Sequence, residues 1–163
     1  MLSIKTGRKI LGVFTDRVPV TLYRIQNGKS VALRDKAIQQ SKKRTSFDLV
    51  LSSKGLVEPL LNNENFIRPN GMSTRPNGPM LQELVRNFSG NRVVLVEIPE
   101  GTLIPQDLVI LHEHTDHYSF QSRVEMRLED LNAKLTAFLI DEGKWMSPDD
   151  FCKENSFEDS INQ

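Results

Sequence analysis

The chain has little of several features that define whole classes of protein. Its one cysteine in 163 residues, Cys152, excludes an internal disulfide and a disulfide-braced extracellular scaffold. Lys+Arg and Asp+Glu both number 21, so no net charge draws the molecule to nucleic acid or an anionic membrane. No apolar run approaches the roughly 20 residues that span a bilayer, and there is no internal repeat. We therefore expect a packed protein in a reducing or redox-indifferent compartment, with no membrane and no disulfide partner.

The length and the N-terminal pattern predict one domain. A chain of 163 residues is long enough to bury a core of its own. The first residues are basic and apolar, but Asp16 and Arg17 follow without a small-residue cleavage site, so we interpret them as mature sequence rather than a signal peptide. We expect a single domain over residues 1–152 and a polar C-terminal tail over residues 153–163.

Hydrophobic patterns along the chain predict an α+β fold. Strands are expected over residues 10–14, 18–25, 47–51, 93–98 and 108–121. Helices are expected over residues 35–43, with Ala37 and Ile38 facing inward, 80–88 and 125–142, and a further helix start at Ser147-Pro148. Residues 52–79, rich in Asn, Pro, Gly and Ser, are expected to form a long binding loop.

The strand expected over residues 108–121 changes from apolar to polar midway and carries all three histidines of the chain. The stretch His112-Glu113-His114-Thr115-Asp116-His117 resembles the first metal-binding motif of the metallo-β-lactamase superfamily. That superfamily needs further histidines, and the chain contains no fourth. In an extended strand His117 would also face away from His112 and His114. We therefore predict no metal site, and keep a metal-dependent hydrolase as the least favoured alternative.

Two other places carry polar groups suited to an anionic ligand. Arg24 ends an otherwise apolar strand face, where it meets either an anion or, in the plainer interpretation, solvent or a carboxylate partner. Ser73 and Thr74 follow the turn Asn70-Gly71 with two adjacent hydroxyls, which suit a ribose or phosphate and equally suit a turn that satisfies its own backbone.

Four motifs in order carry a resemblance to a known family. They are TLYR (21–24), GMST (71–74), IPEGTLIPQDLVI (98–110) and HYSF (117–120), followed by a leucine-rich helix. This order resembles the ADP-ribosyltransferase-like toxin family typified by the second type VI secretion exported effector of Pseudomonas, over about residues 20–140. The resemblance implies an α+β domain in which antiparallel sheets pack face to face and form an NAD-type cleft, with peripheral helices.

The resemblance also implies roles for particular residues. Arg24 would bind a phosphate or ribose of NAD, since a planar guanidinium can donate two hydrogen bonds to one anion. Ser73 and Thr74 would take the paired hydroxyl positions in cofactor binding and catalysis, and His117 and Tyr118 the late-strand catalytic positions. Tyr23 and Tyr118 would offer aromatic surface to a ring of NAD. A glutamate usually occupies the late strand of such transferases, and no E-x-E or Q-x-E motif is present here.

The function implied is that of a toxin or effector: a mono-ADP-ribosyltransferase, of the glycosyltransferase class, that uses NAD to modify a macromolecular target. Such a toxin would act in the cytosol of a producing or target cell, after delivery by a specialised system such as type VI secretion, and would have an immunity or antitoxin protein as partner. The alternative is a non-enzymatic binding module that uses the same cleft or the 52–79 loop.

Overall fold

The computed structural model describes residues 10–60, 69–87 and 92–155. Its helices and strands, in chain order, are β1 (Gly12–Phe14), β2 (Leu22–Asn27), α1 (Lys36–Ser41), β3 (Met72–Thr74), α2 (Pro79–Asn87), β4 (Val93–Ile98), β5 (Leu108–His114), β6 (His117–Ser122), α3 (Leu128–Glu142), β7 (Lys144–Met146) and α4 (Pro148–Glu154). Within the described residues no helix is both long enough and apolar enough to cross a membrane.

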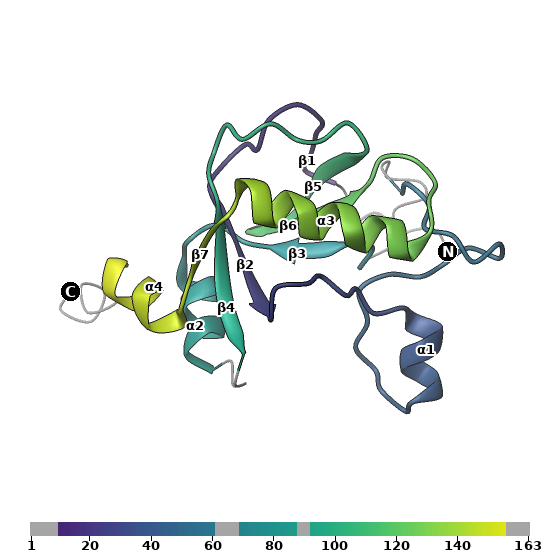
Figure 1. Cartoon of the computed structure of the whole chain (residues 1–163), viewed down its shortest axis with the longest axis horizontal. Helices are drawn as coiled ribbons and strands as arrows, with labels where there is room; N and C mark the ends of the chain where they lie inside the picture. The colour runs from purple at the N-terminus through teal and green to yellow at the C-terminus, as the bar shows by residue number, and fades with distance from the viewer. Residues whose placement is uncertain (1–9, 61–68, 88–91, 156–163) are drawn as a thin grey trace.

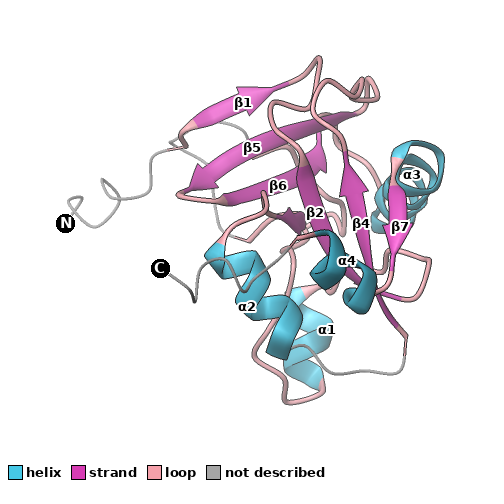
Figure 2. Cartoon of the chain, turned by 90° about the vertical axis from the view of Figure 1, so that its left-hand side faces the viewer, coloured by secondary structure: helices cyan, strands magenta, loops and turns pink. Residues whose placement is uncertain are grey.

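The strands form two antiparallel sheets. One has four strands in the order β1-β5-β6-β3, and the other has three in the order β2-β4-β7. β2 pairs with β4 along its whole length, with Leu22 opposite Ile98 and Asn27 opposite Val93. The strands of the two sheets run in crossing directions (Figures 1 and 2). The expected α+β fold of antiparallel sheets is therefore confirmed.

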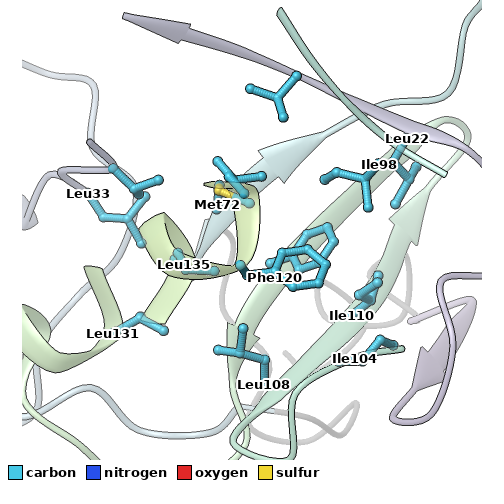
Figure 3. Close-up of a cluster of buried hydrophobic side chains, with 14 of the residues drawn as sticks. Leu22, Leu33, Met72, Ile98, Ile104, Leu108, Ile110, Phe120, Leu131 and Leu135 are labelled. Atoms are coloured by element: carbon cyan, nitrogen blue, oxygen red, sulfur yellow. The ribbon is translucent and has the colours of Figure 1, made fainter. Parts of the chain in front are cut away.

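The two sheets pack against one another through one shared core. Buried side chains come from the three-stranded sheet, such as Leu22 and Ile98, and from the four-stranded sheet, such as Ile110 and Phe120. Figure 3 shows these side chains gathered around Phe120, with Leu135 of α3 on one side. The sheets are also joined at one corner, where Tyr23 and Arg75 exchange backbone N–H···O=C hydrogen bonds of 2.7 and 3.0 Å.

Helix α3 closes this core and was expected from its leucine spacing. Its buried residues are Leu131, Leu135, Phe138 and Leu139. Its polar face also binds a loop, since Asn132 Oδ1 and Thr136 Oγ1 accept hydrogen bonds from the backbone N–H groups of Leu33 and Val31. The helix thereby holds the segment between β2 and α1 in place.

The largest departure from the sequence-based expectation lies in residues 108–121. The single strand expected there is two strands, because the chain turns at Thr115-Asp116 and β6 pairs back on β5. Thr115 takes a φ of 28°, which is rare for a residue with a side chain. The turn brings His117 opposite His114, and Tyr118 opposite His112.

Two smaller predictions were also wrong, because local hydrogen bonds that the hydrophobic pattern does not show decide the structure there. Residues 47–51 form no strand but one bridge, from Leu49 to Asp35. In α1, Ala37 and Ile38 are exposed, and Gln39 is buried instead because its amide donates to Ser46 O at 2.9 Å.

Some expected boundaries also moved. The strand expected over residues 18–25 begins only at Leu22, and the loop expected over residues 52–79 contains β3 and, at its end, Pro79, the first residue of α2. Phe88, expected to end α2, and residues 156–163 of the expected tail lie outside the described residues.

Candidate functional site

Arg24 lies on β2, beside the corner where the two sheets meet. Its side chain is half-buried and donates to two neutral acceptors, Gln26 Oε1 at 3.1 Å and Ser73 O at 3.2 Å. No carboxylate among the described residues lies within ion-pair distance of it. The guanidinium is therefore a cation held by dipoles alone.

Burial makes this cation costly. The pKa of Arg24 is lowered to about 10, mainly by desolvation and to a smaller extent by the nearby Arg34, while Asp48 opposes the shift. Asp48 is itself engaged by Arg34, whose Nε lies 2.9 Å from Asp48 Oδ2. Arg24 is still charged at neutral pH, and an anion placed beside it would offset the free-energy cost of its desolvation.

Two hollows meet at Arg24 and Ser73. The first, of about 150 Å³, is mainly apolar and is lined by Tyr23, Arg24, Ile25, Ser73, Thr74, Arg75, Leu81 and Leu84. The second, of about 510 Å³, is polar and is lined by Arg24, Ile25, Gln26, Asn27, Ser30, Ala32, Arg34, Asp48 and Ser73. An apolar pocket beside a polar groove suits a ligand that has a flat ring at one end and charged groups farther along.

Ser73 and Thr74 lie on a strand rather than in the expected turn. β3 pairs with β6, so that Ser73 is opposite Ser119 and Thr74 is opposite Tyr118. Because side chains alternate along a strand, the two hydroxyls point to opposite faces of the sheet. The Thr74 hydroxyl is buried and donates to Tyr118 O at 3.0 Å, whereas Ser73 Oγ lies 3.1 Å from His117 Nε2. Thr74 therefore holds β3 on β6, whereas the hydroxyl of Ser73 faces His117.

His117 is the first residue of β6 and is held on three sides. Its Nε2 meets Ser73 Oγ, and its ring stacks on His114 with centroids 5.0 Å apart. Its Nδ1 lies 3.1 Å from Glu113 Oε1, although neither carboxylate oxygen receives a hydrogen bond within the described residues, because the contact lies off the ring N–H direction. Ser73, His117 and Arg24 therefore form one continuous polar cluster across β2, β3 and β6.

The two tyrosines beside this cluster have different partners. Tyr118 stacks face to face on His112, with ring centroids 4.0 Å apart, and burial raises the pKa of its phenol. Tyr23 lines the apolar hollow, but its ring packs edge-on against Phe151 at 5.3 Å and its hydroxyl donates to Glu97 at 3.2 Å. Its pKa is raised to about 12, first by burial and then by Glu97.

The structure also brings in two residues that no motif in the sequence indicated. Arg75 lines the apolar hollow and pairs with Asp116 at 2.8 Å, which ties β3 to the β5–β6 turn. Glu113 comes within reach of His117 only because of that turn. A signal for Glu113 was present in the pattern, since it is an acid on the strand face that otherwise carries Val109 and Leu111.

The histidine-rich stretch does not gather into a metal site. No group of three or more His, Cys, Asp or Glu side chains in the described part of the chain could hold a metal ion. His112 faces Thr115 O and Tyr118, and the carboxylate of Asp116 is occupied by Arg75.

Two antiparallel sheets that share a core and meet at a corner, with a few peripheral helices, are consistent with an ADP-ribosyltransferase-like toxin fold. The family model of the Tse2 ADP-ribosyltransferase toxin matches residues 20–151, which covers every site residue above. The chain belongs to this family of toxins. The resemblance drawn from the four motifs is thereby confirmed. A comparison with curated proteins finds no match.

Proposed function

We propose that this toxin cleaves NAD and transfers its ADP-ribose to a macromolecular target. The observation that supports this most directly is Arg24, a cation without a carboxylate partner in the described residues, placed where an apolar hollow and a polar groove meet. NAD has a matching layout of flat rings joined by a pyrophosphate. In the reaction the bond between nicotinamide and ribose breaks, nicotinamide leaves with the bonding electrons, and a nucleophile of the target bonds to the ribose carbon.

Arg24 is proposed to bind the phosphate or ribose groups. Its present partners are a side-chain amide and a backbone carbonyl, which contribute less than a charged acceptor would. Tyr23, with the apolar lining of the first hollow, would contact a ring of the substrate. Ser73 and Thr74 would hold the ribose, Ser73 through its hydroxyl and Thr74 by fixing β3 on β6.

His117 is proposed to line the reaction centre together with Ser73, and Tyr118 is proposed to support it from the opposite face of β6. The His117 Nε2 contact with Ser73 Oγ gives the serine hydroxyl a definite direction, so that its oxygen can face the positive charge that develops on the ribose. Tyr118 would contribute indirectly, because its side chain lies on the opposite face of β6 from His117, where it stacks on His112 and fixes the strand.

The biological setting is part of the same proposal. The toxin would act in the cytosol of a producing or target cell, type VI secretion would deliver it, and an immunity protein would protect the cell that makes it. These proposals are supported by membership of the toxin family.

Transfer of labelled ADP-ribose from NAD to the proteins and nucleic acids of a cell lysate distinguishes the two hypotheses, an ADP-ribosyltransferase and a non-enzymatic binding module. The wild type and Arg123→Ala should both label a target, because Arg123 is exposed and lies at the opposite end of β6 from His117. Arg24→Ala should label at least about 10-fold less, since a charged hydrogen bond contributes about 1.5–3 kcal/mol. If folded wild type gives neither transfer nor nicotinamide release, the chain is a binding module of this fold.

A further inference from the structure

Glu113 stands out as a carboxylate in an apolar row. It follows Val109 and Leu111 on the same face of β5, and both of these are completely buried. Its own side chain is 1% exposed. An acid at this depth normally gathers several hydrogen bonds, yet neither oxygen of Glu113 has one within the described residues.

This arrangement costs stability and therefore needs a reason. A buried carboxylate that accepts no hydrogen bond lowers the stability of a protein core more than almost any other buried group. Within the described residues, the ion-pair contact of Glu113 is with His117, whose Nδ1 is 3.1 Å from Oε1. A residue that strains the fold while it faces a single histidine is typical of a functional position.

The backbone holds the two residues together from both sides. Glu113 lies at the register shift of β5 between His112 and His114, and His117 begins β6 after the turn at Thr115 and Asp116. The turn is clamped from outside by the 2.8 Å ion pair of Asp116 with Arg75, next to β3. Glu113, His117 and Ser73 thus follow one another across three neighbouring strands.

We propose that Glu113 is a positioning residue that fixes the direction and the proton of His117. The carboxylate 3.1 Å from Nδ1 favours a proton on that nitrogen through charge attraction, although the contact is not a hydrogen bond. This leaves Nε2 as an acceptor for the hydroxyl proton of Ser73. The negative charge also increases the electron density on Nε2 and, through it, on Ser73 Oγ. The catalytic part of this inference rests on the proposed cleavage of NAD. In that reaction the ribose becomes positive, and the negative charge of Glu113 would act on it through His117 and Ser73.

The kinetic test compares the wild type with Glu113→Gln, and with Glu125→Gln as a matched control at an exposed acid. Glu113→Gln should lower kcat for nicotinamide release at least about 10-fold and leave KM for NAD within about 2-fold, because the group acts on the reaction rather than on binding. Its melting temperature should equal or exceed that of the wild type, since a buried charge is removed. Unchanged kcat in Glu113→Gln would overturn the role, as would an equal loss in Glu125→Gln.

A spectroscopic test decides the pairing without any turnover. In ¹⁵N spectra of the imidazoles, His117 of the wild type should carry its proton on Nδ1, and in Glu113→Leu the proton should shift toward Nε2. Identical spectra of the two proteins would refute the pairing. If the wild type releases no nicotinamide, the proposed function fails, and the spectra alone support or overturn the part assigned to Glu113.

Discussion

Replacement of Arg24 by methionine should separate binding from stability. Methionine keeps the apolar stem and removes the buried charge. The lowered pKa of about 10 corresponds to roughly 3 kcal/mol of desolvation, and to about half of that once water in the two hollows screens the charge. Against this gain, Gln26 Oε1, in a side chain only 4% exposed, loses its donor at a cost of about 1–3 kcal/mol. The two terms nearly cancel, so we expect the melting temperature to change by less than about 4 °C.

Affinity for NAD should respond quite differently. Loss of a charge-assisted hydrogen bond of about 1.5–3 kcal/mol raises Kd by about 10- to 150-fold. Titration calorimetry with NAD and a thermal melt of the same sample measure both quantities, with Arg123→Met as the matched control. A variant that melts many degrees lower but binds NAD as well as the wild type would show that Arg24 is a structural residue, and the reasoning above would be refuted.

Two further predictions concern the fold around the site. Tyr23 keeps its proton up to a pH of about 12 in the folded state, against about 10 when unfolded, so its contribution is complete below pH 10 and is lost as the pH rises toward 12. Tyr23→Phe, which also removes the contact with Glu97, should abolish that alkaline loss, roughly 1 kcal/mol between pH 9 and pH 11, in denaturant titrations at those two values. An unchanged pH slope would disprove it. A Cβ at Gly71 would lie 2.3 Å from Phe120 O, whereas one at Gly78 meets nothing within 4 Å. Gly71→Ala should therefore cost about 1–3 kcal/mol of unfolding free energy, and Gly78→Ala less than about 0.5 kcal/mol; equal losses would contradict the close approach.

Much of the fold could be predicted because its strands and helices carry strong periodic patterns. The run Val93–Ile98 is β4 with the same bounds, and the leucine spacing located α3. The β5–β6 turn could not be seen, because Thr115 and Asp116 replace the glycine or asparagine that announces a tight turn. β3 was hidden for a similar reason, since three residues between turn-forming neighbours carry almost no pattern.

The site was only partly accessible from sequence for the same physical reason. Arg24, Ser73 and His117 could be picked out by residue type and by resemblance, and the structure brings them together. Glu113 was visible only as an acid on an apolar strand face, and its role could not be predicted because it depends on a contact made across a turn that the sequence did not reveal. Tyr23 illustrates the opposite case: its aromatic type suited a ligand, yet Phe151, far along the chain, packs against its ring.

The position of α3 in chain order bears on how this toxin is made. A ribosome releases Arg24, Ser73 and His117 well before α3, whose leucines complete the core that both sheets share. Until that helix has emerged the two sheets have no closed interior to hold them in register, and folding of the domain as a unit must wait for it. A nascent chain or a fragment that stops short of residue 128 therefore carries the side chains of the proposed site but lacks the helix that closes the core behind them.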